Sequence, residues 1–335
     1  MEYSLFLSNM PRLQAGPLSS HLSAWKELCA PPAWILSTLA VGHSIRFKRA
    51  PPPFNGVMKT SFSSPAQAAV LSAEIQELLS KRAIRRVPDG EKYAGFYAHY
   101  FLVPKKSGGM RPVLDLSLFN DFVQRLEFKM LTVTQLKAAI LPGDWCSSID
   151  LKDAFFHVPI LQRHRKYLRF SFRDVAYEFN VLPFGYSLAP RTFSKCVSAA
   201  LAPLRRLGIR ILSYLDDLLI LAPSEMQAMA HTARLVSHLS NLGLAINWPK
   251  SSPWPSRQVI YLSISLDTQS MLASLSPDRR SDLRKALRLL APGRMTRIST
   301  VRRLLGLMAA AHAVVPLGLL HMRYLQRWFN TLGAF

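Results

Sequence analysis

The chain has 335 residues, of which 49% are hydrophobic and 19% charged, so it is long enough for two or three lobes with buried cores and does not have the composition of a disordered polypeptide. Lys and Arg outnumber Asp and Glu by 42 to 20, and the net charge of +22 favours a polyanionic partner, nucleic acid before acidic membrane. Three widely spaced cysteines argue against a disulfide framework, and the amino-terminal residues lack the pattern of a signal peptide, so we expect a nuclear or cytoplasmic protein that is not secreted.

The first predicted elements follow an N-terminal arm, residues 1–60, which ends in a Pro-rich linker. Ser64 begins a Ser-Pro-Ala-Gln capping box, and the apolar spacing after it predicts an amphipathic helix to about Arg82. Two strands and the basic hairpin tip between them come next, at 100–104, 105–110 and 111–116.

A mixed pattern of hairpins and helices occupies the middle of the chain and predicts an α+β fold, an antiparallel sheet backed by helices. One hairpin turns at Arg173-Asp174 and another at Leu215-Asp216. The predicted elements are a strand at 145–151, a hairpin at 167–172 and 176–181, a helix at 190–202, a hairpin at 209–221, a helix at 224–242, and strands at 244–247 and 259–266.

From Pro277 onward the pattern predicts helices only. The first of them carries a cationic stripe, Arg280, Arg284 and Arg288, beside a leucine stripe at 283, 287 and 290 that we expect to pack inward. The apolar run 304–320 is interrupted by Gly, His and Pro and is shorter than the ~20 residues of a membrane span, so we expect a buried helix and no membrane partner.

Two adjacent carboxylates lie inside an apolar β-type run, in Tyr214-Leu215-Asp216-Asp217. An unpaired buried charge is strongly unfavourable, so a metal ion or a cationic group is expected beside them. Asp150, at the end of another apolar strand, offers a third carboxylate, and several Asp on adjacent strands suit a pair of Mg²⁺ ions. The alternative is a solvated hairpin tip with Asp150 as a local cap.

Five motifs in order resemble the successive motifs of reverse transcriptases. They are Lys106…Arg111-Pro112-Val113-Leu114-Asp115-Leu116, Asp150-Leu151-Lys152-Asp153-Ala154-Phe155, Leu182-Pro183-Phe184-Gly185, Tyr214-Leu215-Asp216-Asp217 and Trp248-Pro249-Lys250. The runs 149–155, 181–185 and 304–311 look closest to the DIRS-type retrotransposon enzymes.

The resemblance covers about residues 40–330 and implies a right-hand polymerase with a split βαβ-like palm. Its implied domains are fingers at 61–144, a palm at 145–266 with fingers elements inserted around 152–185, and a helical thumb at 267–335. The implied activity is Mg²⁺-dependent transfer from dNTPs onto a primer on an RNA template, through an RNA–DNA hybrid, with Mn²⁺ as another usable ion.

The resemblance also implies residue roles. Asp150 and Asp216 would bind both ions with Asp217 and the backbone of Leu151 in support, and Lys250 would be the general acid for pyrophosphate. The residues implied in dNTP binding are Lys106, Arg111, the amides of Asp153 and Ala154, Phe155 against the sugar 2′ position, and Phe184 with Gly185. Those implied in primer and template contact are Tyr214, Tyr261, Leu262, Arg280, Arg284 and Arg288, with Ser263 where the family usually has Gly.

Four histidines, 157, 164, 231 and 238, lack a partner set in the sequence, and we expect them at the surface or on helices. A hydrolase is a weaker alternative, from Gly-Tyr-Ser-Leu-Ala at 185–189 with Asp216 and His231 following. Two further alternatives are a catalytically inactive nucleic-acid binder and an RNA-templated RNA polymerase, which the aromatic Phe155 disfavours. A last alternative is a fragment of a reverse transcriptase/ribonuclease H polyprotein, because no acidic cluster follows the thumb.

Overall fold

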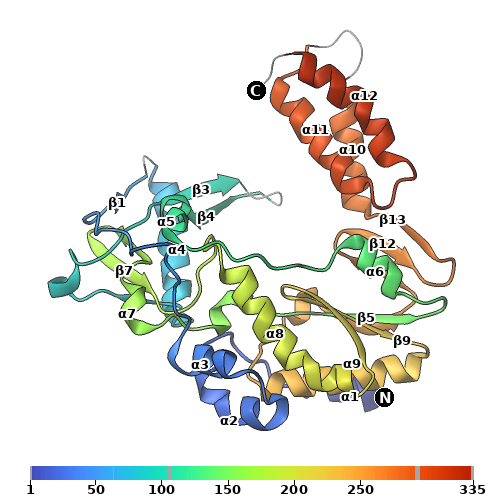
Figure 1. Ribbon diagram of the computed structural model, residues 1–335, viewed down its shortest axis with the longest axis horizontal. Coiled ribbons are helices and arrows are strands. Elements are labelled where there is room, and N and C mark those ends of the chain that lie inside the picture. Colours follow the sequence, from blue (N-terminus) through green and yellow to red (C-terminus); the bar gives the residue numbers. More distant parts are fainter. Residues whose placement is uncertain (1, 63, 105–107, 291–294, 333–335) are drawn as a thin grey trace. The chain divides into compact units, whose positions relative to one another are not determined.

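The computed structural model describes residues 2–62, 64–104, 108–290 and 295–332 (Figure 1). Its α-helices are α1 Glu2–Ser8, α2 Leu22–Ala24, α3 Ala33–Val41, α4 Pro65–Ser80, α5 Ser117–Phe122, α6 Val133–Ala139, α7 Gln162–Arg165, α8 Ala189–Arg206, α9 Glu225–Asn241, α10 Pro277–Arg288, α11 Ile298–Ala311 and α12 Gly318–Thr331. Short 3₁₀ helices are η1 Leu18–His21, η3 Asp89–Glu91, η4 Ala154–His157 and η5 Trp248–Lys250, and η2 Trp25–Cys29 is a π-helix.

The strands form four sheets with the orders β1-β6-β7-β2, β10-β5-β9-β8, β11-β12-β13 and β3-β4. Their bounds are β1 Lys59–Thr60, β2 Ile84–Arg86, β3 Tyr100–Pro104, β4 Met110–Leu114, β5 Trp145–Asp150, β6 Arg169–Phe172, β7 Val175–Phe179, β8 Arg210–Tyr214, β9 Asp217–Ala222, β10 Ser252–Ser256, β11 Gln258–Tyr261, β12 Ile264–Asp267 and β13 Leu272–Leu275. The chain divides into two compact units, one of residues 1–129, 149–218 and 233–251, the other of 130–148, 219–232 and 252–335.

The N-terminal segment is helical, whereas the sequence pattern predicted no helices before Ser64. Within the first unit, η2 packs against α8, and the side chain of Trp25 is fully buried with its Nε1 donating to the Leu242 carbonyl at 3.0 Å. Few periodic apolar positions mark these short helices, and η2 is stabilised by packing on α8 rather than by an amphipathic pattern.

Helix α4 confirms the predicted helix, with Pro65 at its first position and the inward residues Leu71, Ile75 and Leu78 all buried. The predicted capping box is wrong, because the Ser64 side chain makes no hydrogen bond to the helix end. The helix therefore depends on its buried face and on the fixed φ of proline.

The hairpin β6–β7 turns at Arg173 and Asp174, as predicted, with positive φ at both residues (48° and 61°). Two-residue turns of this kind match the right-handed twist of the flanking strands. On the same sheet β1 runs parallel to β6, and β2 pairs antiparallel with β7.

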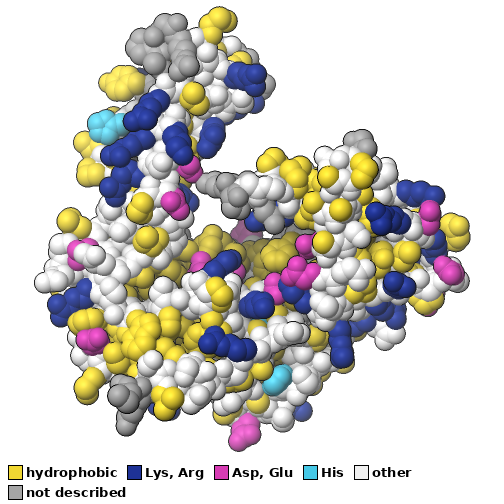
Figure 2. Space-filling view, turned by 180° about the vertical axis from the view of Figure 1, so that it is seen from behind, with side chains coloured by type: hydrophobic (Ala, Val, Ile, Leu, Met, Phe, Trp, Pro, Cys, Tyr) yellow, Lys and Arg dark blue, Asp and Glu magenta, His cyan; other side chains and the backbone are white. Residues whose placement is uncertain are grey.

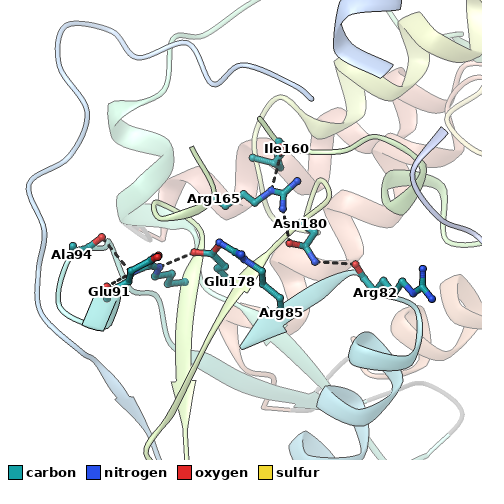
Figure 3. A network of polar contacts seen from close by, with 9 residues as sticks. Arg82, Arg85, Glu91, Ala94, Ile160, Arg165, Glu178 and Asn180 are labelled. Atoms are coloured by element: carbon teal, nitrogen blue, oxygen red, sulfur yellow. Dashed lines mark hydrogen bonds and ion pairs between the residues drawn. The ribbon is translucent and has the colours of Figure 1, made fainter. Parts of the chain in front are cut away.

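A buried ionic network crosses this sheet (Figure 3). Glu178 on β7 accepts from Arg169 Nε at 2.9 Å and lies 2.7 Å from Arg85 Nη2, while Arg169 Nη1 donates to the carbonyls of Glu91 and Ala94. The side chains of Glu178 and Arg169 are each only 2% exposed. Each buried charge is thus neutralised and hydrogen-bonded, which is the condition under which burial of an ion pair is tolerated.

The predicted strand 259–266 is wrong in one respect: β11 and β12 are separate strands joined by a turn at Leu262 and Ser263, both with positive φ. In the second unit this hairpin continues into β13, and α10, α11 and α12 lie side by side after it (Figure 1). No helix in the described ranges is long and apolar enough to cross a membrane.

Candidate active site

Asp150 ends β5, and hydrogen bonds of its own backbone and of Leu151 fix its position. Its N–H donates to Ser251 Oγ at 3.0 Å, and its carbonyl accepts from the Asn247 N–H at 2.8 Å. The next amide, of Leu151, donates to the carbonyl of Asp216 at 2.9 Å. Asp150 is therefore held between the hairpin tip and the segment that carries Lys250.

Asp216 and Asp217 lie where β8 turns into β9. Leu215 has a φ of 55°, which allows the tight turn predicted from the sequence, and Asp217 is the first residue of β9. The turn prevents the two side chains from pointing to opposite faces, as they would in a straight strand. Both carboxylates are half-buried.

The carboxylates perturb one another. Burial raises the pKa of Asp216, and the charge of Asp150 raises it further. Burial also raises the pKa of Asp217 to about 6, with additional contributions from Asp216, from Asp150 and from a side-chain hydrogen bond with Asp150. Lys250 lowers both pKa values. Three carboxylates and one lysine thus share one electrostatic environment.

This donor set fits a hard divalent cation. Across the described part of the chain, no three His, Cys, Asp or Glu side chains are already arranged as a coordination sphere. Raised pKa values show that the negative charges at Asp216 and Asp217 are unfavourable where they stand, and a cation between oxygen donors relieves that repulsion. Carboxylate oxygens are the ligands Mg²⁺ prefers.

His157 is a buried positioning residue that sequence analysis missed. It is fully buried rather than at the surface, and burial lowers its pKa to about 4, so the ring is neutral. Its Nε2 accepts from the Ala245 N–H at 3.0 Å, which places the proton on Nδ1, 3.0 Å from the Ala154 carbonyl. His157 therefore joins η4 to the segment that hydrogen-bonds Asp150.

The motif after Asp150 forms a tight bend. Asp153 has a φ of 49° and its carboxylate lies 3.0 Å from Lys81 Nζ. Ala154 is the first residue of η4, so its amide and that of Asp153 have no acceptor within the helix, as phosphate-binding amides require. Phe155 is only 8% exposed, and its ring packs against Phe184 at 5.0 Å between centroids.

The loop carrying Phe184 and Gly185 is held by Asn120, which the sequence did not single out. Asn120 Nδ2 donates to the Gly185 carbonyl at 2.8 Å, and its Oδ1 accepts from the Ser187 N–H at 2.9 Å. Gly185 has a φ of 91°, and a Cβ on it would lie 3.1 Å from the Leu114 carbonyl oxygen. Phe184 is 56% exposed.

Substitution of Gly185 by Ala is expected to destabilise the protein by about 1–2 kcal/mol, because a Cβ is unfavourable at this φ and crowds Leu114. Gly108 is a matched control for the backbone, since its φ is 88° and a Cβ there would meet nothing within 4 Å. Urea unfolding of the two alanine variants separates two costs: backbone strain alone at Gly108, and backbone strain together with crowding against Leu114 at Gly185. A smaller loss at Gly185 than at Gly108 would contradict the close approach.

The remaining predicted nucleotide and primer residues occupy varied settings. Lys106 lies outside the described residues. Arg111 is exposed on β4, paired in register with Val103, and Lys250 is exposed in η5. Tyr214 is the half-buried last residue of β8.

In the second unit, Tyr261 is only 3% exposed, so its side chain is a core residue of the β11–β12 hairpin, and Leu262 lies in the turn. The predicted leucine stripe of α10 is partly wrong: Leu287 is 49% exposed and Ala286 is the buried position. Figure 2 shows Lys and Arg side chains spread over the C-terminal helices. Three of these residues line a shallow pocket of about 340 Å³ on α10: Arg280, Arg284 and Arg288.

Comparison with known proteins finds similarity to one family over the middle of the chain. The model of the family described as reverse transcriptase (RNA-dependent DNA polymerase) matches residues 103–266. The transposon Tf2-3 and Tf2-4 polyproteins of Schizosaccharomyces pombe are each 27% identical over 186 residues, 56% of this chain. The chain spans 13% of the length of these curated relatives.

Two solved structures of the foamy viral protease-reverse transcriptase share the fold. One is a complex with double-stranded DNA and the other with an RNA/DNA hybrid. Each superposes with a TM-score of 0.68 at 17% identity over 94% of this chain, and the match covers 56% and 43% of those chains. Residues 103–266 therefore resemble the reverse transcriptase family, and the chain has the fold of these right-hand polymerases.

Proposed function

We propose that this chain is the polymerase part of a retrotransposon reverse transcriptase, which transfers nucleotides from dNTPs onto a primer 3′-OH on an RNA template. The observation that carries the proposal is the meeting of Asp150, Asp216 and Asp217 at the end of β5 and the β8–β9 turn, inside a reverse transcriptase domain. Nothing in the fold favours the alternative of a catalytically inactive nucleic-acid binder.

Asp150 and Asp216 are the proposed ligands of two divalent ions, Mg²⁺ or Mn²⁺, supported by Asp217 and the backbone of Leu151. Such ions, when bound, activate the attacking hydroxyl and stabilise the leaving oxygen of an in-line phosphoryl displacement. Lys250, exposed in η5 and close enough to lower the pKa of both turn carboxylates, holds a proton that can pass to pyrophosphate.

The amides of Asp153 and Ala154 are the proposed donors to the triphosphate, with Lys106 and Arg111 as its cationic clamp. Tyr214, Leu262 and the α10 arginines are proposed to contact primer and template. Tyr261 is proposed to act by holding the hairpin, since its side chain is buried.

The domain boundaries stay part of this proposal: fingers at 61–144, palm at 145–266 and thumb at 267–335. A DIRS-type origin, supported by the motif Ile149-Asp150-Leu151-Lys152-Asp153-Ala154-Phe155, and a nuclear or cytoplasmic location are also proposed. The deciding experiment is extension of a DNA primer on an RNA template with dNTPs and then with NTPs, in Mg²⁺ and with a chelator. Extension that continues in the chelator, or that uses NTPs equally well, would contradict the proposal.

Substitution of Phe155 by Ala is expected to reduce discrimination against ribonucleotides by about 10–200-fold, because the ring no longer occupies the space of a 2′-hydroxyl. Phe193→Ala is the matched control: Phe193 is fully buried and its ring lies 6.0 Å from that of Phe155, so it loses a similar core contact. Single-nucleotide incorporation of dNTP and rNTP gives the ratio. The milder Phe155→Val tests the same gate with less loss of core packing, and an equal change in Phe193→Ala would show that looser packing, not the gate, governs selectivity.

A further inference from the structure

A second site in the first unit is a pocket of about 650 Å³. Its walls are α3 with the residues after it and one face of α8 from the N-cap to Ala202. This volume lies in the range of sites that hold small molecules, and it exceeds the space that one inorganic phosphate needs. None of the proposed catalytic or nucleotide-binding residues lines the pocket.

The charge of the pocket wall is of one sign. Arg46 comes from the segment after α3, and Arg191 and Lys195 come from successive turns of α8. None of the described residues lining the pocket is acidic. Three cationic side chains around one cavity without a counter-charge in its wall give the pocket a positive potential that attracts anions.

The N-terminal end of α8 adds to this positive potential. Leu188, the N-cap, and Thr192 both line the pocket, and no side chain caps the helix. The first amide of this 18-residue helix, that of Ala189, donates to the Tyr186 carbonyl at 3.0 Å, and Pro190 has no N–H, so these two positions offer no amide to an anion. The helix end therefore contributes the positive end of its dipole to the potential of the pocket.

Arg191 supplies an observation that is independent of the helix end. Its Nε is buried and has no hydrogen-bond partner in the protein. A buried guanidinium donor without an acceptor is costly, whereas a phosphate oxygen in the pocket would satisfy it.

His43 links the pocket to the motif loop but does not add charge. Its ring nitrogen Nε2 lies 3.1 Å from the hydroxyl of Tyr186. Burial lowers the pKa of His43 to about 4, and the positive charges of His164, Arg46 and Arg191 lower it further. His43 is therefore neutral and lines the pocket as a hydrogen-bonding group. The positive charge of the pocket comes from Arg46, Arg191 and Lys195.

We propose that this pocket binds phosphate groups, held by Arg191 and Lys195 at the N-terminal turns of α8 with Arg46 opposite. Hydroxyls of Ser44 and Ser198, which also line the pocket, can donate to the remaining phosphate oxygens. The phosphate comes either from the backbone of a nucleic-acid strand or from a free polyphosphate. The inference does not depend on the proposed catalysis.

The test is a binding measurement in a chelator, without turnover, using tripolyphosphate and a short single-stranded RNA as separate probes. Arg191→Gln and Lys195→Gln are each expected to weaken tripolyphosphate binding about 10-fold, as loss of a charge-assisted hydrogen bond does. Arg206→Gln is the matched control, because Arg206 is an exposed residue of the same helix that does not line the pocket. Lys195 is exposed, so its variant keeps the test valid if the Arg191 variant folds poorly.

The two probes identify the source of the phosphate. If the pocket holds a nucleic-acid strand, both variants also weaken RNA binding and lower the slope of log affinity against log salt by about one. If it holds a free polyphosphate, RNA binding is unchanged relative to Arg206→Gln. The proposal is overturned if the wild-type protein binds neither probe, or if Arg206→Gln weakens binding as much as the pocket variants. Because the measurement is made in a chelator without turnover, its outcome is separate from the fate of the catalytic proposal.

Discussion

Substitution of Asp216 by Asn is expected to reduce dNTP incorporation by about 10³-fold, roughly 4 kcal/mol of barrier, while the protein keeps its stability. Asn preserves the shape of the side chain but removes a charge that would hold both ions. Because burial and Asp150 raise the pKa of Asp216, its ionised form is unfavourable in the folded protein. Removing that charge at neutral pH in metal-free buffer should therefore leave the melting temperature unchanged or higher.

Asp174→Asn is the matched control for this experiment. Asp174 also lies in a two-residue hairpin turn with positive φ, but its side chain is 74% exposed and pairs with Lys59. Single-turnover extension and thermal unfolding of both variants separate loss of chemistry from loss of fold. Equal incorporation by Asp216→Asn and the wild type would refute the assigned mechanism, and a large loss in Asp174→Asn would show that the assay reports folding.

Substitution of Glu178 by Ala is expected to destabilise the protein by about 3–5 kcal/mol, because it leaves Arg169 buried without its counter-charge. The guanidinium keeps the carbonyls of Glu91 and Ala94, which satisfy its donors but do not neutralise it. Urea unfolding measures the loss of unfolding free energy. The comparison holds when the variant and the wild type have the same m-value, the slope of free energy against denaturant concentration.

Arg85→Ala is the control, since it removes the other partner of Glu178 from a position that is 41% exposed. Water replaces that partner readily, so a loss of at most about 1 kcal/mol is expected. If Glu178→Ala and Arg85→Ala lose similar unfolding free energy, the buried Arg169–Glu178 pair is not the main source of the stability of the network.

Local chemistry allowed much of this fold to be predicted. The hairpins at Arg173-Asp174 and at Leu215-Asp216 each place an Asp between β-type runs, and short polar residues tolerate the turn conformation. Helix α4 and the strands β3 and β5 followed from periodicity over several residues. The grouping of Asp150 with the Asp216 turn was predicted from the need for a third oxygen ligand and was supported by the resemblance, because no local pattern says which strands are neighbours.

What the sequence did not reveal depends on partners distant in the chain. Asn120 meets the loop at 185–187, and His157 meets Ala245, contacts that leave no periodic signal. The residue pattern gave no sign of the break between β11 and β12, because Leu262 and Ser263 are unusual residues for positive φ, and only the resemblance, which puts residues 261–263 in a primer-grip hairpin, indicated a turn there. Among the elements before Ser64, η2 packs on α8, a distant contact that propensity cannot anticipate.

The contacts of Asn120 make the loop at 185–187 dependent on two other segments of the fold. One amide side chain spans the loop from Gly185 to Ser187, and the backbone of Gly185 lies against the Leu114 carbonyl of β4. A graft of the loop alone would lose the hydrogen bonds from Asn120 and the contact with Leu114. The loop therefore has to be transferred together with β4 and α5. Variation during evolution is subject to the same limit, and these three segments are expected to change in concert.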